Sequence, residues 1–396
     1  MHGPPPAPRP SSPAARAGAM SAPGPVPLMD PQRTYGAWGP DAERDVLAVL
    51  RSNTFVRGPR VAELERRMAL RLATARAVAV GSGTQALSLV LGAWLRDRAP
   101  DAREVVVPAF SFIATAGAVL EAGGTPVFAD VDAESFLLDP ASVAEVASAR
   151  TAAVVPVHLF GAPVDLAPLR AALDAAGASD ALVLEDAAQA IDATWQGAPV
   201  GSLGDAAAFS FYPSKNLAAA GDAGLVSTPD VALADRVARL REHGAGAVAY
   251  EHLEPGTNAR MDEMQAAVLL ARLAHLSSWT ADRRLQAQRY IEALAGSAAT
   301  PQRVDPRAES AWHLFVVRVA ARDAVRARLA EAGVSSGVYY PLPLHRQPAL
   351  GPWNRRALPV AERLAGEVLA LPCFPGLTDG EQQRVLDALR RALDVA

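Results

Sequence analysis

The feature that most constrains the fold is a series of short apolar runs that alternate with alanine-rich segments between about Arg76 and Thr228. Strands that alternate with helices in this way form a mainly parallel sheet with helices on both faces. In such open sheets ligands bind at the carboxyl ends of the strands, so we expect functional residues just after these runs. The runs are AVAV at 77–80, EVVV at 104–107, PVFAD at 126–130, AAVVPV at 152–157, ALVLED at 181–186 and AAFSF at 207–211.

Beyond about Pro255 the pattern changes, and 396 residues are enough for two domains. We expect a large domain at 29–255, whose first helix could pack on a smaller α+β domain at 256–396. The small domain is predicted to contain long helices over about 261–295, strands near His313–Val319 and Gly337–Tyr340, and a last helix that starts at a capping box at Thr378 and runs to about Leu393.

Residues 1–28 are rich in Pro, Ala, Ser and Gly, cannot bury enough apolar area to order themselves, and are predicted to be a disordered tail. Met20 and Met29 leave a later natural start open, and no apolar run resembling a signal peptide follows. The longest apolar stretch, Val105 to Leu120, holds Pro108 and is shorter than the roughly 20 residues of a bilayer span. It is predicted to be a buried strand followed by a helix, with no membrane association.

Charge and cysteine content exclude several classes of function for this chain. The formal net charge is −4 with interspersed signs, so no nucleic-acid-binding face is expected. Cys373 is the only cysteine, which excludes an intrachain disulfide and a Cys-rich metal site and favours a reducing cytoplasmic location. No His/Asp/Glu spacing suggests a metal site.

Lys215 is the only lysine of the chain. A primary amine, unlike a guanidinium, can form an imine, so a single retained lysine suggests Schiff-base chemistry with a carbonyl such as that of pyridoxal phosphate. Chance loss of the other lysines is the alternative. The segment 209–216 leaves an apolar strand and brings Ser210 to the same sheet edge as Lys215. Phosphate-binding P-loop and Ser-x-x-Lys hydrolase motifs do not fit, because the required glycine and serine are missing.

Two further strand ends carry candidate groups. Gly81–Ala86 opens a helix and predicts an anion site for a phosphate, although a degenerate dinucleotide fingerprint of a nicotinamide oxidoreductase or a plain glycine turn remains open. Asp186 ends a very apolar strand, where a buried carboxylate needs a cationic partner such as a pyridinium nitrogen. A helix-capping role for Asp186 is equally compatible with the local sequence.

Other candidates have weaker support from the residues alone. Phe110 and Phe112 could stack on a planar cofactor or simply pack in the core. Asn258 precedes a helix and could contact a ligand or a second subunit, although a plain capped helix explains this segment equally well. His345 ends the Pro-rich segment Tyr339-Tyr340-Pro-Leu-Pro-Leu-His345, where it could face a substrate or lie at the surface, whereas His158 is expected to be structural.

Five segments in order, GSGTQAL, PAFSFIATAGAVLEAGGTPVFADVD, EDAAQAI, SFYPSKNLAAAGDAG and GTNARMDEMQAA, strongly resemble the nucleotide-sugar aminotransferases of the DegT/DnrJ/StrS type over roughly 29–395. The resemblance implies aminotransferase fold type I, with a mainly parallel seven-stranded sheet between helices. It also implies pyridoxal 5'-phosphate as cofactor, an amino-acid donor suggested to be glutamate, a nucleotide-sugar substrate, and a homodimer with shared active sites.

The resemblance also implies residue roles. Lys215 matches the lysine that binds the cofactor, Asp186 the acid on its ring nitrogen, Gln189 a side chain near its hydroxyl, and Phe112 the stacking aromatic, with Phe110 as the alternative. Phosphate contacts match Gly83, Thr84, Ser210 and, across the dimer, Asn258, while Tyr340 and His345 lie where the family approaches the sugar nucleotide.

The sequence after Lys215, Gly-Asp-Ala-Gly at 221–224, is more like enzymes that act at carbon 3 of a keto sugar than at carbon 4. A related sugar dehydratase has histidine in place of the lysine, so the retained Lys215 argues against that activity. A non-enzymatic regulator on the same fold is a further alternative.

Overall fold

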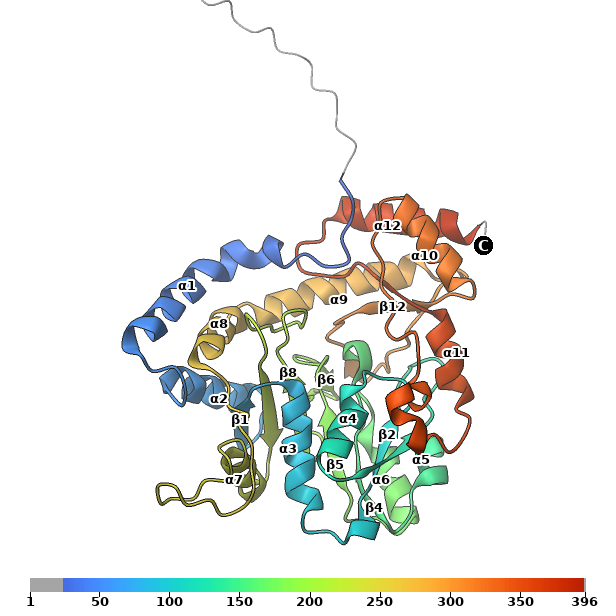
Figure 1. The fold of residues 1–396 in the computed structure, drawn as a ribbon. Coiled ribbons are helices and arrows are strands. Elements are labelled where there is room, and N and C mark those ends of the chain that lie inside the picture. Colours follow the sequence, from blue (N-terminus) through green and yellow to red (C-terminus); the bar gives the residue numbers. More distant parts are fainter. Residues whose placement is uncertain (1–23, 395–396) are drawn as a thin grey trace, which may run out of the picture.

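A computed structural model describes residues 24–394 of the chain. Its centre is a seven-stranded sheet in the order β1-β9-β8-β5-β4-β2-β3, as predicted for this fold class (Figure 1). The strands are β1 (Arg76–Val80), β2 (Glu104–Pro108), β3 (Thr125–Ala129), β4 (Thr151–Val154), β5 (Leu182–Asp186), β8 (Ala206–Ser210) and β9 (Gly224–Thr228). Only β9 runs antiparallel to its neighbours β1 and β8, and it is the strand that no predicted apolar run anticipated.

Both faces of the sheet are covered, which explains the apolar character of its strands. On β2, Val105 and Val107 join one core cluster, whereas Val106 joins a different cluster on the opposite face. This alternation is the period of two that a strand imposes on its side chains. The helices of this part are α1 (Tyr35–Ser52), α2 (Pro59–Arg71), α3 (Gly83–Leu95), α4 (Ala114–Glu121), α5 (Pro140–Val146), α6 (Leu166–Ala175) and α7 (Val231–Leu240).

The C-terminal part combines helices with a small antiparallel sheet of β10 (Thr300–Pro301), β12 (Phe315–Arg318) and β13 (Val368–Leu371). A second small sheet joins β6 (Thr194–Trp195) and β7 (Ala198–Pro199) to β11 (Ala308–Glu309). The helices of this part are α8 (Glu263–Leu273), α9 (Leu276–Ala293), α10 (Arg322–Glu331), α11 (Pro359–Glu367) and α12 (Asp379–Leu393). In Figure 1, α9 lies above the large sheet and α12 lies above α9.

Most small-domain predictions are confirmed, and one is wrong. Thr378 forms the predicted capping box at the start of α12, and the predicted strand near His313–Val319 is β12. The segment Gly337–Tyr340 is not a strand, because only Gly337 bridges to Ala370 of β13. Pro341 and Pro343 follow, and proline has no N–H to donate to a ladder.

The N-terminal segment is held against the C-terminal part. Residues 1–23 of the predicted tail lie outside the described residues, but Val26 is fully buried and its backbone bonds to Gly333 O (2.8 Å) and Ser335 N (2.9 Å). Residues 24–28 are therefore part of the fold, which corrects the predicted tail. Arg33 then forms two hydrogen bonds to Glu381, at 2.6 and 2.7 Å.

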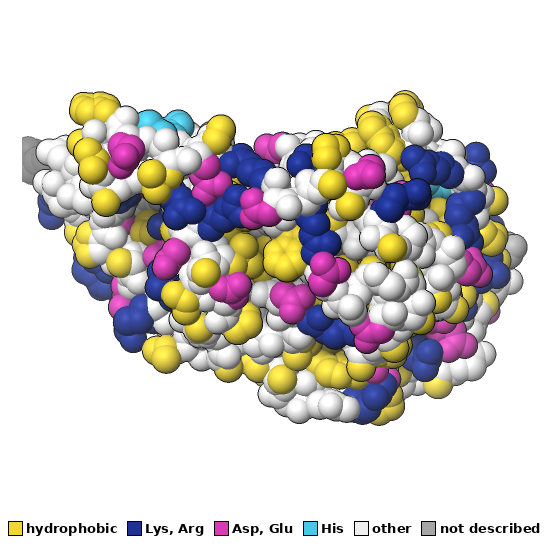
Figure 2. Space-filling view, turned by 90° about the horizontal axis from the view of Figure 1, so that it is seen from below, with side chains coloured by type: hydrophobic (Ala, Val, Ile, Leu, Met, Phe, Trp, Pro, Cys, Tyr) yellow, Lys and Arg dark blue, Asp and Glu magenta, His cyan; other side chains and the backbone are white. Residues whose placement is uncertain are grey.

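Within residues 24–394 no helix is long and apolar enough to cross a membrane. The longest apolar stretch of the sequence divides into β2 and α4, as predicted. On the face shown in Figure 2, basic and acidic side chains are interspersed.

Candidate functional site

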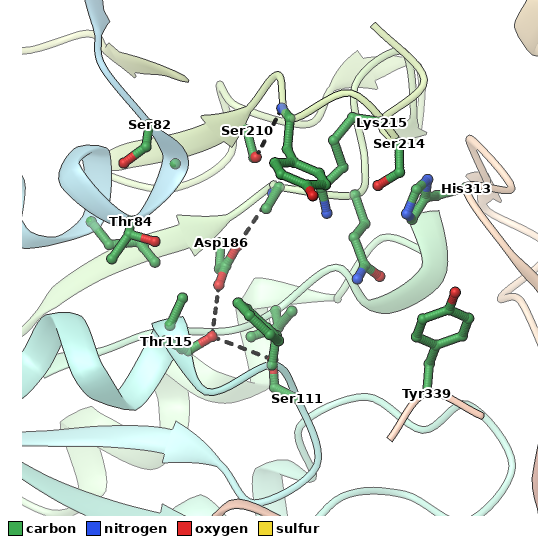
Figure 3. Close-up of a pocket in the computed structure, with 18 of the residues that line it drawn as sticks. Ser82, Thr84, Ser111, Thr115, Asp186, Ser210, Ser214, Lys215, His313 and Tyr339 are labelled. Atoms are coloured by element: carbon green, nitrogen blue, oxygen red, sulfur yellow. Dashed lines mark hydrogen bonds between the residues drawn. The ribbon is translucent and has the colours of Figure 1, made fainter. Parts of the chain in front are cut away.

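A cavity of about 520 Å³ opens beside the carboxyl ends of β5 and β8, and the predicted Lys215 and Asp186 both line it (Figure 3). Loops that follow the parallel strands converge there, as expected for this sheet type. Of the predicted site residues, the cavity is lined by Gly83, Thr84, Phe112, Asp186, Gln189, Ser210, Lys215 and Tyr340.

Lys215 lies in the loop after β8, where its backbone N–H donates to Tyr212 O at 2.8 Å. Burial lowers the pKa of its amine to about 8, and the negative charge of Asp186 acts against that shift. An amine with such a pKa is partly unprotonated near neutral pH, as a nucleophile or proton acceptor requires.

Asp186, the last residue of β5, is 5% exposed. Its carboxylate accepts hydrogen bonds from Thr115 Oγ1 (2.8 Å) and from the backbone N–H of Ala188 (3.2 Å). Burial raises the pKa of this carboxyl, and the Thr115 hydrogen bond acts against the increase. Among residues 24–394 no basic side chain lies within ion-pair distance of it, although the charge of Lys215 acts on it, so the carboxylate can still take a cation as its direct partner.

The N-terminus of α3 faces the same cavity. Ser82 caps the helix by accepting from Gln85 N at 3.1 Å, while first-turn N–H groups have no partner within a helix. A side chain at Gly83 would lie 2.7 Å from Ser210 Cβ, and one at Gly224 would clash with the Ser82 backbone. The two glycines thus let α3, β8 and β9 approach closely, and the cradle that these elements form suits an anion.

Two aromatic side chains and an amide form another part of the wall. Gln189 Nε2 donates to the Tyr340 hydroxyl at 3.1 Å, and Gln189 Oε1 accepts from Phe160 N at 2.6 Å. Phe112 lies 5.9 Å from the Tyr340 ring and is 54% exposed, whereas Phe110 is buried in the core. Phe112, not Phe110, therefore has a free face in the cavity.

Sequence reasoning missed several residues of the cavity. Thr115 lies in α4, and its hydroxyl contacts both Asp186 and Ser111 (3.3 Å). His313 and Tyr339 come from the C-terminal part and line the cavity, and Figure 3 shows the His313 ring beside Ser214. No local motif marks these positions, although Tyr339 stands beside the predicted Tyr340.

Two predicted residues lie outside this cavity. His345 is 1% exposed, packs against Phe128, and pairs through Nε2 with Glu362 Oε1 at 3.0 Å. The interpretation of His345 as a substrate-facing residue is therefore wrong, because its side chain is enclosed and its Nε2 is occupied. Asn258 is exposed, bridges to Glu242 and is not among the residues that line the cavity, so its role stays a prediction.

The residues fit pyridoxal phosphate. The cradle at α3 suits a phosphate, the unpaired buried Asp186 suits a pyridinium nitrogen, and Phe112 offers a ring face. His158, expected to be structural, hydrogen-bonds Glu185 Oε2 at 2.9 Å behind the site, and Glu185 also accepts from three backbone N–H groups. This network fixes the end of β5 just before Asp186.

Comparison with known proteins agrees with the site. Residues 38–390 match the model of the DegT/DnrJ/EryC1/StrS aminotransferase family. The erythromycin biosynthesis sensory transduction protein EryC1 of Saccharopolyspora erythraea is 43% identical over 368 residues, covering 92% of this chain and 99% of that protein. The dTDP-3-amino-3,4,6-trideoxy-alpha-D-glucose transaminase of Streptomyces venezuelae is 39% identical, and the match covers 92% of this chain and 95% of that protein.

A solved structure has the same fold. The crystal structure of S. venezuelae DesV in complex with a ketimine intermediate superposes with a TM-score of 0.88 at 39% identity. The match covers 93% of this chain and 98% of DesV.

Proposed function

This chain belongs to the DegT/DnrJ/EryC1/StrS aminotransferase family and is a pyridoxal-phosphate-dependent aminotransferase, and from that premise we propose its substrates. We propose that it transfers an amino group from glutamate to carbon 3 of a nucleotide-linked keto-deoxysugar, with a dTDP-linked sugar as the first candidate. The amino sugar would serve antibiotic or surface-glycan biosynthesis.

The observation that carries the proposal is that the only lysine, Lys215, and the buried Asp186 line one cavity. The position of amination is supported by the name of the S. venezuelae relative, a 3-amino-sugar transaminase, and by the sequence Gly-Asp-Ala-Gly after the lysine. The retained lysine argues against dehydration, and the unpaired acid argues against a nicotinamide cofactor.

The bound cofactor would supply an electron-withdrawing pyridinium ring. Asp186 would hold the proton on the ring nitrogen, and the N-terminus of α3 with Ser210 would fix the phosphate. Lys215, with a pKa of about 8, would remove a proton from the carbon that bears the donor nitrogen and would pass that proton to the cofactor. Tyr340 keeps its proton because burial raises its pKa, so its hydroxyl can donate to a substrate oxygen.

The proposal includes a cytoplasmic homodimer. Phe112 and Tyr212 line the cavity yet are 54% and 55% exposed, which suits a second subunit at the cavity mouth. Asn258 would reach the phosphate of the partner's site. Mixing Lys215→Ala with Asn258→Asp chains tests this, since a mixed dimer would regain one complete site. Absence of any regained activity in verified mixed dimers would contradict shared sites.

The function is tested with purified enzyme, pyridoxal phosphate, ¹⁵N-glutamate and a panel of dTDP- and UDP-linked 3-keto and 4-keto sugars. We expect an amino sugar that carries ¹⁵N at carbon 3. A deoxygenated product without ¹⁵N would indicate a dehydratase. Failure of glutamate and other amino acids to convert the yellow cofactor to its pyridoxamine form would indicate a protein that binds the cofactor without transamination.

A further inference from the structure

His313 is a histidine of the cavity to which the proposed function gives no role. It lies shortly before β12, is 5% exposed, and lines the same cavity as Lys215. Figure 3 shows its ring at the edge of the cavity beside Ser214, on the side where the Lys215 side chain enters.

The hydrogen bonds of Asn216 set the tautomer of this histidine. Asn216 Nδ2 donates to Ala311 O at 2.9 Å, which turns Asn216 Oδ1 towards His313 Nδ1 at 3.1 Å. An amide oxygen accepts, so Nδ1 must carry the proton and Nε2 must keep its lone pair. Asn216 is 7% exposed and directly follows Lys215 in the chain.

The imidazole is also held uncharged. Burial lowers its pKa well below the usual value, and the positive charges of Lys215 and Arg283 lower it further. Arg283 lies on α9 and donates to the backbone oxygen of His313 at 3.2 Å. A neutral ring with a free Nε2 can accept a hydrogen bond, but it cannot pair with a carboxylate or a phosphate.

The Ser214 hydroxyl, which lies beside the ring in Figure 3, and the Lys215 amine are both donors that could use this acceptor, but only the amine carries a charge. It lies in the same cavity, its charge acts on His313, and no other group among residues 24–394 donates to Nε2. Besides Asp186 of β5, whose charge acts on the amine, the titratable side chains that line the cavity are those of Tyr212, Asp222, Tyr339 and Tyr340.

We propose that His313 is a positioning residue for Lys215. Its Nε2 accepts a hydrogen bond from the lysine amine when that amine is free of the cofactor. This bond holds the amine beside the substrate carbon whose proton it removes. This role deepens the proposed function, and its effect on turnover rests on that function. The contact between His313 and Lys215 does not depend on which sugar is used.

Two variants separate the effects of the two ring nitrogens of His313. In His313→Asn the side-chain amide N–H can replace Nδ1–H opposite Asn216, while the Nε2 acceptor is lost. In His313→Gln the longer side chain brings an amide oxygen near the place of Nε2. The readout is the pKa of Lys215 in enzyme loaded with pyridoxamine phosphate, which leaves the lysine amine free.

Because the chain has one lysine, trace acetylation with acetic anhydride across pH, followed by mass spectrometry, reports this amine alone, with the N-terminal amine as internal standard. A neutral acceptor stabilises the ammonium form. His313→Asn should therefore lower the midpoint by about one pH unit, a tenfold change in acidity, and His313→Gln should shift it less. The smaller Asn side chain would admit water, which raises the midpoint, so a decrease cannot be a hydration effect.

The donor half-reaction with glutamate should slow about tenfold in His313→Asn and be largely restored in His313→Gln. An unchanged or increased Lys215 midpoint in a folded His313→Asn enzyme overturns the proposal, and an increased KM for the sugar alone would assign His313 to substrate contact instead. Without any variant, ¹⁵N NMR of histidine-labelled enzyme must show an unprotonated Nε2 whose signal changes between the pyridoxal and pyridoxamine forms. A protonated Nε2 overturns the proposal, whether or not the sugar assignment holds.

Discussion

Thr115 of α4 and Asp186 of β5 are 71 residues apart, and the Thr115 hydroxyl donates a 2.8 Å hydrogen bond to the Asp186 carboxylate. Both side chains are buried, so this bond favours the charged carboxylate in a place where burial favours the neutral acid. The charge of Asp186, on which its proposed contact with the cofactor depends, is thus partly set by a residue of helix α4.

Replacing Thr115 by valine keeps the shape of the side chain and removes the donor. The carboxylate then has the Ala188 N–H alone, its pKa increases, and we expect about tenfold weaker binding of pyridoxal phosphate, the equivalent of one pKa unit. Absorbance titration of the cofactor measures the effect. Thr115→Ser retains the hydroxyl and should bind like the wild type, so equal affinities of the Val and wild-type enzymes would refute the role of this bond.

Asp186→Asn should separate stability from activity. Burial raises the pKa of Asp186 in the folded cofactor-free protein above its value in the unfolded chain. Between these two pKa values the folded protein binds more protons than the unfolded chain. The free energy of unfolding therefore decreases as the pH rises from the lower value to the higher. The neutral amide avoids this loss, and we expect the cofactor-free variant to be about 1 kcal/mol more stable at pH 7. Turnover should decrease about a hundredfold or more. Urea unfolding at pH 4 and pH 7 and steady-state assays check both parts.

Lys215→Ala and Lys215→Arg should both fold and bind the cofactor, yet both should lose at least about a thousandfold in transamination, because neither can form an imine or accept the proton. Borohydride reduction of the wild-type holoenzyme should modify the Lys215 peptide, and neither variant should retain cofactor after reduction and denaturation. Modification at another site, or near-normal turnover of the Arg variant, would contradict the assignment.

The rate of the glutamate half-reaction should increase with pH around a midpoint near 8. Burial lowers the pKa of the Lys215 amine to about 8, and only the unprotonated amine can accept the substrate proton. Stopped-flow absorbance of the cofactor at saturating glutamate gives this midpoint. A rate independent of pH between 6.5 and 9 would show that another group accepts the proton.

Strand ends could be predicted from the sequence, but contacts between distant segments could not. Lys215 and Asp186 follow apolar runs, and the edge of a parallel sheet necessarily brings such ends together. Thr115 and His313 contribute through α4 and the C-terminal part, whose approach depends on packing of the whole chain. His345 was misassigned because a Pro-rich loop does not reveal whether its side chain turns outward or, as here, towards Phe128 and Glu362.

Besides the backbone hydrogen bonds of Val26, an ion pair of Arg33 holds the N-terminal segment against the C-terminal part. Arg33 donates to both carboxylate oxygens of Glu381 and to Gly376 O (2.9 Å), while Met29, four residues earlier, lines the cavity. The Arg33 guanidinium lowers the pKa of Glu381 to about 2. Stability from this pair is therefore present above the ordinary Glu pKa and is lost as pH falls towards 2.

Arg33→Gln should reduce the free energy of unfolding at pH 7 by about 1 kcal/mol, since the pair is bidentate but partly exposed. The difference from wild type should shrink at pH 3, as Glu381 becomes protonated in the unfolded chain and the linked stabilisation decreases. Because Met29 lines the cavity, the KM for the sugar should increase while covalent attachment of the cofactor to Lys215 stays intact. Arg44→Gln, which removes a more exposed ion pair with Asp41 on α1, is the matched control and should change neither quantity. Urea unfolding and steady-state kinetics of both variants decide the point, and equal behaviour of the two arginine variants would show that Arg33 does not fix the segment at the cavity.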